Sequence, residues 1–226
     1  MPFVGREKEI EQIREALAEE KNVILSGRYG MGRTSVVQYL ARTTQDRWRF
    51  VFVDFSKTPG NVCNYLLAEL FPKQEFDRVH LKYRSSRYRI ATLAVDDGRK
   101  HVLVLDNVSK LSVKKLDLIR YLTWERRFQF VSIVESFLPS NDLFQLRVRM
   151  NPSILSTLHH LNTSSVAQFY RELSEEHQMG WTEGQIKDLA DITGGYPLRM
   201  KEIALRELQR KRQDVSDGTH YTGTLK

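Results

Sequence analysis

Residues 23–35, Val-Ile-Leu-Ser-Gly-Arg-Tyr-Gly-Met-Gly-Arg-Thr-Ser, decide the fold class of this chain. The apolar run at 23–25 meets a turn that is rich in glycine, and the turn opens onto an amphipathic run at 36–41. A short apolar run bounded by turn residues indicates a buried strand, and the amphipathic run indicates a helix. The stretch therefore predicts a strand, a loop and a helix in direct succession.

The glycines of this turn have the spacing of a phosphate-binding loop. Gly27, Gly32 and Thr34 fit the pattern G-x-x-x-x-G-K-S/T, but Arg33 stands where the pattern has lysine. Arginine keeps the positive charge but carries it on a longer, planar fork. Backbone N–H groups in such a loop surround a phosphate at a helix N-terminus, where the helix dipole favours negative charge. The alternative is a glycine turn that joins a buried strand to a helix and binds nothing.

The candidate nucleotide contacts are the loop residues themselves. They are Gly27, Tyr29, Gly30, Met31, Gly32, Arg33, Thr34 and Ser35. The hydroxyl of Thr34 is also a candidate Mg²⁺ ligand, because Mg²⁺ takes oxygen ligands.

A carboxylate follows a later buried strand. Four aliphatic residues at 102–105 precede Asp106, which places an acid at the carboxyl end of a strand, where ligands bind in open α/β sheets. Asp106 is therefore the second candidate Mg²⁺ ligand, and the alternative is a buried strand that ends in a turn acid. Asn107 comes next, and an amide can orient water but cannot accept its proton.

Strands and helices alternate before the final third of the chain. The apolar runs at 49–55 and 128–134 indicate two further strands, and we expect a fifth at 156–161. His159 and His160 would then face opposite sides of that strand, which argues against a metal site made by this pair.

The final third of the chain is predicted to be helical. Capping-box spacings begin at Ser165 and at Thr182. A Gly-Gly pair ends one helix and Pro197 opens the next, which we expect to end at about Arg212. Residues 213–226 are polar and aperiodic, which predicts a disordered tail.

The composition limits the class of protein. The chain has 226 residues, of which 41% are hydrophobic, enough for one large domain with or without an appendage. The net charge of +7 suits an anionic partner such as DNA, although a modest excess is also ordinary for a solvated surface. Cys63 is the only cysteine, so no intrachain disulfide can form. The charged N-terminus and the lack of long apolar runs predict a cytoplasmic protein with no membrane contact.

Five features in this order resemble an AAA+/STAND-like P-loop ATPase module of the archaeal-type, origin-recognition-related group. The features are the opening Phe3-Val4-Gly5-Arg6-Glu7, the loop at 27–35, Asp106 after its strand, the strand end at Glu135-Ser136, and Gly194-Gly195-Tyr196-Pro197. The resemblance extends from Phe3 to about Leu208. It implies an α/β fold with a five-stranded, mostly parallel sheet of order 5-1-4-3-2 and a C-terminal helical lid. The corresponding domains are 1–161 for nucleotide binding and 162–212 for the lid.

The resemblance also implies nucleotide contacts outside the loop. Val4 and Gly5 would pack on the adenine. Pro197 and Arg199 would belong to the lid, with Arg199 directed at the γ-phosphate.

The catalytic candidates implied by the resemblance are Asp106, Asn107, Ser136 and Arg147. Ser136 would sense the γ-phosphate, and Glu135 beside it is an alternative acid for activating water. Arg147 or Arg149 would reach into the site of a neighbouring copy, which implies self-association.

The resulting prediction is a switch that binds ATP or ADP with Mg²⁺ and hydrolyses ATP slowly or when a partner stimulates it. The alternative is a scaffold that binds nucleotide without hydrolysis and contacts DNA or a partner protein. A third interpretation is a degenerate fold that binds no nucleotide. Arg33 and Asn107 depart from the family pattern at positions that affect catalysis more than binding, so whether the chain is an ATPase stays open at this point.

Overall fold

The computed structural model describes residues 1–72, 82–93 and 98–218 of the chain. These residues form two compact units. The sheet unit contains Lys8–Tyr29 and Arg33–Leu158, and the helical unit contains Met1–Glu7, Gly30–Gly32 and the chain from His159 onward. The expected boundary between residues 161 and 162 stays a prediction. Within the described part of the chain, no helix has both the length and the apolar character needed to cross a membrane.

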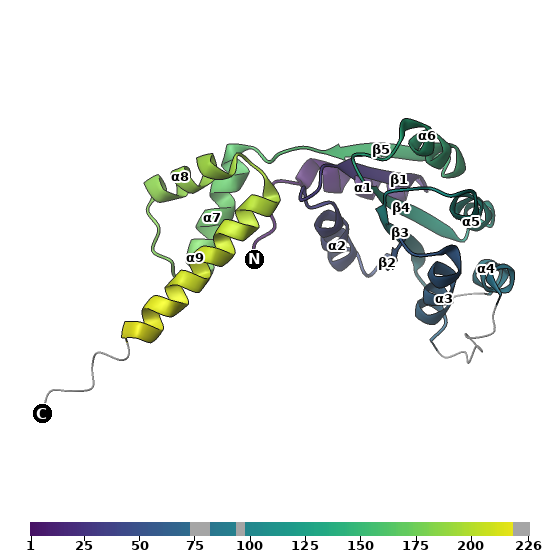
Figure 1. The fold of residues 1–226 in the computed structure, drawn as a ribbon, viewed down its shortest axis with the longest axis horizontal. Helices are drawn as coiled ribbons and strands as arrows, with labels where there is room; N and C mark the ends of the chain where they lie inside the picture. Colours follow the sequence, from purple (N-terminus) through teal and green to yellow (C-terminus); the bar gives the residue numbers. More distant parts are fainter. Residues whose placement is uncertain (73–81, 94–97, 219–226) are drawn as a thin grey trace, which may run out of the picture. The chain divides into compact units, whose positions relative to one another are not determined.

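The sheet unit is built on five parallel strands, which confirms the expected α/β fold (Figure 1). The strands are β1 (Asn22–Gly27), β2 (Trp48–Asp54), β3 (Lys100–Val108), β4 (Phe128–Val134) and β5 (Ser153–Leu158). Their order is β2-β3-β4-β1-β5, which is the expected order read from the other edge. Because all strands are parallel, their carboxyl ends lie along one edge of the sheet.

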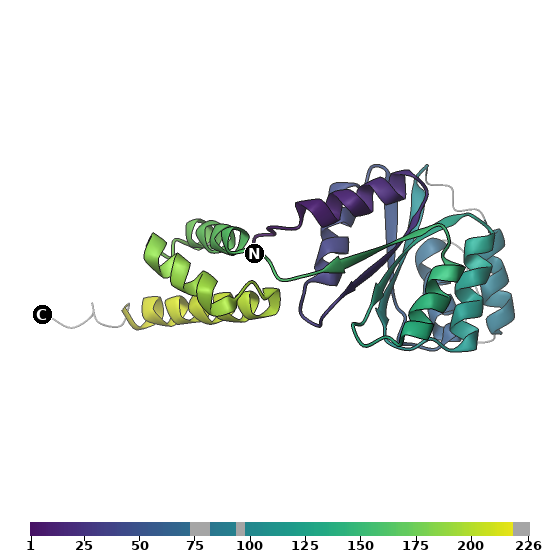
Figure 2. The same cartoon turned by 90° about the horizontal axis from the view of Figure 1, so that it is seen from above.

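Helices cover both faces of this sheet, as Figure 2 shows. They are α1 (Glu7–Ala18), α2 (Arg33–Thr43), α3 (Pro59–Leu70), α4 (Tyr83–Thr92), α5 (Val113–Trp124) and α6 (Ser140–Arg149). Helices α1 and α2 lie on one face, and α3, α5 and α6 lie on the other. Alternate residues of β3, Leu103 and Leu105, belong to the same buried cluster as Leu66 of α3 and Ile119 of α5. The other residues of β3 face the opposite side, so both faces are covered and the strands are apolar throughout.

The fifth strand ends earlier than the sequence suggested. It pairs with β1 from Asn22 with Ser153 to Gly27 with Leu158, so its last residue is set by the end of β1. The prediction of a strand at 156–161 was therefore wrong by three residues. His159 and His160 follow the strand instead of lying on it.

The helical unit packs α7 (Thr163–His177), α8 (Glu183–Thr193) and α9 (Pro197–Gly218) around one apolar core. The stripe of Val166, Phe169, Tyr170 and Leu173 on α7 is buried in that core. Helix α9 continues past the expected end at Arg212, and residues 219–226 of the predicted tail lie outside the described residues.

Two capping predictions had different outcomes. The capping box at Thr182 is formed, since its side chain accepts from the backbone N–H of Gln185 and the Gln185 side chain accepts in return. The box expected at Ser165 is not formed, because Asn162 is the cap and its side chain accepts from the Ser165 N–H at 2.7 Å. Asparagine is among the strongest N-cap residues, and it begins α7 three residues earlier.

The Gly-Gly turn between α8 and α9 requires glycine at both positions, for different reasons. Gly194 has φ of +56° and Gly195 has φ of +73°, both in the left-handed region. The Gly195 carbonyl accepts a hydrogen bond from the Leu161 N–H at 2.8 Å. A Cβ on Gly195 would lie 2.0 Å from the Leu161 carbonyl oxygen, whereas a Cβ on Gly194 would meet nothing within 4 Å.

We therefore expect Gly195→Ala to destabilise the protein by more than about 3 kcal/mol, because a backbone oxygen must move and the left-handed conformation is strained. Gly194→Ala is the matched control and should cost only the left-handed strain, about 1 kcal/mol. Urea unfolding of both variants, followed by circular dichroism, measures the difference. Equal losses would contradict the close approach at Gly195.

Candidate functional site

The loop between β1 and α2 has the backbone of a phosphate-binding loop. It leaves β1 at Gly27 and enters α2 at Arg33. Gly30 and Gly32 have φ of +77° and +81°, which a residue with a Cβ adopts only with strain. The loop thus reaches the N-terminus of α2, where unpaired backbone N–H groups and the helix dipole favour an anion.

The two candidate Mg²⁺ ligands meet at the carboxyl edge of the sheet. The Thr34 hydroxyl donates a hydrogen bond to Asp106 Oδ2 at 3.1 Å. Among the described residues, no group of three or more His, Cys, Asp or Glu side chains is placed to hold a metal ion. A hydroxyl and a single carboxylate fit Mg²⁺, because this ion usually binds few protein ligands and completes its shell with phosphate oxygens and water.

Arg33 does not point freely into the loop. Its side chain is 8% exposed, and Nη2 lies 2.7 Å from Oε2 of Glu135, which is 14% exposed. Its Nη1 also donates to the Val134 carbonyl oxygen at the end of β4. The planar fork allows both contacts at once, which a lysine ammonium could not make with the same geometry. The positive charge at the lysine position is therefore already neutralised by Glu135.

This ion pair changes the interpretation of Glu135. The sequence suggested Glu135 as an alternative acid that activates water. Its carboxylate is instead the counter-ion of Arg33, whose Nη2 donates to Oε2 at 2.7 Å. Ser136, the candidate sensor beside it, is exposed.

Asn107 lies in an irregular part of β3. The pairing of β3 with β4 shifts between Leu105 and Val108, and Asn107 has a left-handed φ of +60°. Its backbone N–H donates to Asp106 Oδ1 at 2.8 Å, and its side-chain amide donates to Asp54 Oδ1 at 3.3 Å. Asn107 thereby links two carboxylates on neighbouring strands, β2 and β3.

Asp54 is a site residue that the sequence analysis missed. It ends β2 and is paired in register with Asp106. Hydrogen bonds from Ser56 are the main reason that the pKa of Asp54 is lowered, and the Asn107 amide adds to the effect. An acid at the end of the apolar run at 49–55 was the signal, since the same argument identified Asp106.

Several predicted site residues lie together within the helical unit. Val4 is buried in its core, and the Leu198 N–H donates to the Gly30 carbonyl oxygen at 3.1 Å. Arg6, which is 4% exposed, donates from Nη2 to the carbonyl oxygens of Met31 at 3.3 Å and His159 at 2.7 Å. The opening segment, the loop tip and the Gly-Gly-x-Pro turn therefore belong to one compact unit. Arg6 is a second missed residue, and its signal was a charge inside an otherwise apolar opening.

The remaining candidates are exposed or half-buried in their units. In the sheet unit, Tyr29, Ser35 and Arg147 are exposed, and Arg149 donates from Nη1 to the Gln145 side chain at 2.7 Å. In the helical unit, Gly5 is close to α7, since a Cβ there would lie 2.5 Å from Ser165 Cβ. Pro197 begins α9 and Arg199 is exposed. The nucleotide and catalytic roles of all these residues stay predictions.

Comparison with known proteins identifies one family. The family model described as the AAA ATPase domain matches residues 2–134, more than half of the chain. No curated protein matches the sequence.

Solved structures share the fold at low identity. The Orc1 protein of Aeropyrum pernix, solved in complex with DNA, has a TM-score of 0.65 and 17% identity over 95% of this chain. Cdc6p of Pyrobaculum aerophilum has a TM-score of 0.67 and 16% identity over 92% of this chain. The RuvB Holliday junction branch migration motor of Thermotoga maritima has a TM-score of 0.55 and 15% identity over 96%. This chain spans 66%, 62% and 65% of those three chains, respectively, which is less than two thirds of each.

The Arg33–Glu135 pair yields a stability prediction. Glu135→Ala should lower the free energy of unfolding by about 3 kcal/mol, because it leaves a buried guanidinium without its counter-ion. Glu183→Ala is the matched control: Glu183 contacts Arg171 at 2.8 Å, but both side chains are largely exposed. Its loss should be much smaller, since solvent already screens an exposed pair. Urea unfolding measures both, and similar losses would mean that the Arg33 pair is as solvated as the surface pair.

Proposed function

Because the chain belongs to the AAA ATPase domain family, we propose that it is an ATP-binding module that acts as a nucleotide-dependent switch, with slow or partner-stimulated hydrolysis. The observation that carries the proposal is the hydrogen bond between Thr34 and Asp106, 3.1 Å long. It joins the phosphate-binding loop to the acid at the carboxyl end of β3. That edge is where ligands bind in open α/β sheets.

The loop and the two Mg²⁺ ligands would hold the phosphates. Backbone N–H groups of residues 27–35 would take the β- and γ-phosphates, and Thr34 and Asp106 would hold Mg²⁺. When bound, Mg²⁺ neutralises charge on the phosphate oxygens. Val4 and Gly5 would contact the adenine. The family resemblance assigns Arg199 to the γ-phosphate, and a contact made only with ATP would give the two nucleotide states different energies.

Slow hydrolysis follows from the groups at the carboxyl edge. Asn107 cannot take a proton from water, and Glu135 is occupied by Arg33. An arginine supplied by a neighbouring copy, for which Arg147 and Arg149 are the candidates, would stabilise charge on the transferred phosphate. Hydrolysis would then depend on self-association.

The second candidate function is a nucleotide-binding scaffold that does not hydrolyse ATP and contacts DNA or a partner protein. The neutralised Arg33 favours it, because the cation at the lysine position is paired with Glu135 and is not free to stabilise the developing phosphate charge. Among structures with this fold, the A. pernix Orc1 protein was solved in complex with DNA, and Drosophila ORC was solved bound to DNA. DNA contact by this chain is a proposal.

Nucleotide binding can be tested directly. The purified protein should bind ATP and ADP in the presence of Mg²⁺, and Thr34→Ala should weaken Mg²⁺-ATP binding about tenfold through loss of one ligand, or about 1.4 kcal/mol. Thr43→Ala, at the exposed end of the same helix, is the control and should bind normally. Isothermal titration calorimetry measures the affinities. Absence of binding by the unaltered protein would refute the switch and leave only the fold.

ATP hydrolysis can be tested by a substitution at Asn107. Asn107→Glu should raise phosphate release about 100-fold over a slow unaltered protein, because a carboxylate can accept the proton of the attacking water. Asn107→Gln has nearly the same size without the charge and should not gain activity. Turnover in Asn107→Glu with none in the unaltered protein would identify the non-hydrolysing scaffold. No gain over a measurable starting rate would show that water is activated elsewhere.

A further inference from the structure

A groove in the sheet unit lies between the C-terminal ends of α5 and α6. Its volume is about 500 Å³, and its lining includes three arginines, one tryptophan and no acidic side chain. The residues that matter are Arg120, Trp124, Arg126, Val148 and Arg149. Trp124 is 82% exposed and Val148 is 54% exposed. Burial of an indole of this size would stabilise a protein, so a ring left in water at the last turn of a helix needs an explanation.

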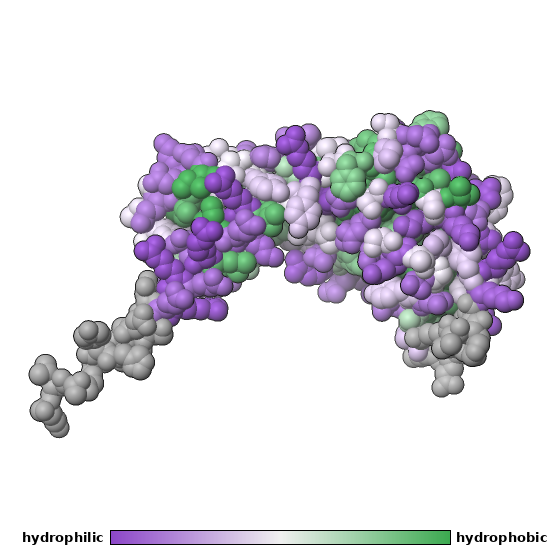
Figure 3. Space-filling view, in the orientation of Figure 1, coloured by the Kyte–Doolittle hydropathy of each residue, from purple (hydrophilic) through white to green (hydrophobic). Residues whose placement is uncertain are grey.

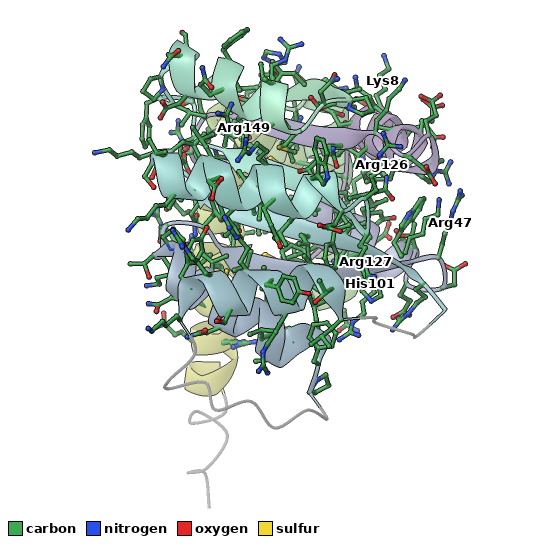
Figure 4. The ribbon with its side chains drawn as sticks, turned by 90° about the vertical axis from the view of Figure 1, so that its right-hand side faces the viewer. Lys8, Arg47, His101, Arg126, Arg127 and Arg149 are labelled. Carbon is green, nitrogen blue, oxygen red and sulfur yellow. The ribbon has the colours of Figure 1, made fainter. Side chains whose placement is uncertain are left out.

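The groove adjoins a larger cavity at the amino ends of the strands. This cavity has a volume of about 800 Å³ and shares Thr123, Arg126 and Asn151 with the groove. It adds the cations Arg99, Lys100 and Arg127, and also the acids Glu19 and Glu20. Figure 4 shows Arg47, His101, Arg126 and Arg127 at one side of the sheet unit. Cationic side chains are thus found from the end of α5 to the amino ends of the strands, whereas the phosphate-binding loop lies at the carboxyl ends.

Some of these cations have structural roles. Arg127 donates to the Leu93 carbonyl oxygen at 3.0 Å, and Arg99 donates to the Gln45 carbonyl oxygen at 3.3 Å. Both carbonyls follow helices, and arginine at such ends offsets the negative end of the helix dipole. Lys100 is paired with Glu20 at 2.7 Å, and Arg120 of the groove is paired with Asp117 at 3.1 Å. Both pairs are exposed to solvent, which screens them, so a polyanion can compete for these cations. Arg126 is exposed and lines both cavities, so it stands at the centre of the surface.

We propose that this surface binds single-stranded nucleic acid, with a base stacked on Trp124 and the phosphates held by Arg126 and the neighbouring arginines. Stacking on an exposed aromatic ring together with a basic groove is how proteins bind unpaired strands without reading sequence. Duplex bases are stacked on each other and would leave the indole without a partner. The proposal commits to a polyanion because the groove itself is lined by three arginines and no acidic side chain.

A peptide fits the surface less well. A helical partner is held by apolar anchors at i, i+3, i+4 and i+7 in a continuous groove. Here the apolar groups that line the groove are one indole and Val148, and the other apolar side chain exposed on α6 near them, Phe144, does not line it. Figure 3 shows apolar side chains over α6 interspersed with hydrophilic ones. Trp124 is therefore the one aromatic platform within the groove, and three arginines surround it.

The proposal does not depend on nucleotide binding at the loop. It gives the scaffold alternative a location for DNA contact, and it can be tested without nucleotide. Thr34→Ala keeps the groove intact, so this variant should bind the strand as the unaltered protein does, although its Mg²⁺-ATP binding is weakened.

The experiment is fluorescence anisotropy with a labelled oligo(dT) of about 16 nucleotides, in a salt series without nucleotide. We expect Trp124→Ala to weaken binding about tenfold, and Trp124→Phe to retain most of it because the ring is kept. Replacing Arg120 and Arg126 by glutamine should weaken binding and lower the slope of log K against log salt by about 1.4, near 0.7 for each lost contact. Replacing the exposed α9 residues Arg206 and Arg210 by glutamine removes the same charge elsewhere and should leave binding nearly unchanged.

Three outcomes would overturn the proposal. The first is no oligo(dT) binding at low salt, and the second is equal affinity for Trp124→Ala and the unaltered protein. The third is displacement of oligo(dT) by poly-glutamate at lower concentration than by unlabelled oligo(dT), which would assign the surface to an acidic protein. We expect the variants to fold, because Trp124 and Arg126 are exposed. Circular dichroism of each variant checks this.

Discussion

The contact of Arg33 with Glu135 and the Val134 carbonyl joins the phosphate-binding loop to the end of β4. It places a guanidinium where the loop pattern has an ammonium, and it satisfies that charge from within the sheet. An ion buried without its counter-ion is strongly destabilising, so the loop and β4 depend on each other. For nucleotide to recruit Arg33, the phosphates would have to compete with Glu135. Any binding energy used to break that pair is lost from the measured affinity.

A second contact, between Thr34 and Asp106, has the opposite character. It is a hydrogen bond between two groups that are partly open to solvent, and Mg²⁺ would replace it at little cost. The edge of the sheet therefore combines a firmly held cation with a weakly held metal-ligand pair. This combination favours the metal-ligand pair as the part of the edge that exchanges partners when Mg²⁺-nucleotide binds, while the Arg33 pair stays in place.

The sequence predicted local features well and distant pairings poorly. The loop spacing and Asp106 were sufficient to predict that Thr34 and a carboxylate would meet, because parallel strands share one carboxyl edge. The strand order came from the family resemblance, since spacing does not encode it. The Arg33–Glu135 pair joins residues 102 positions apart and depends on the register of the sheet. The end of β5 was mispredicted for the same reason, and the cap of α7 was mispredicted because Asn162 competed with Ser165.

The division of the chain into units has a mechanical consequence. The three residues Gly30–Gly32 belong to the helical unit, while the residues on both sides of them belong to the sheet unit. Within the phosphate-binding loop, the chain therefore leaves the sheet unit and returns to it, and Gly30 and Gly32 have left-handed φ values there. Arg6 donates to the Met31 carbonyl oxygen in this loop and to the His159 carbonyl oxygen, where the long C-terminal segment of the helical unit begins. A phosphate held by the backbone N–H groups of residues 30–32 would therefore bind directly to the unit that contains α7, α8 and α9.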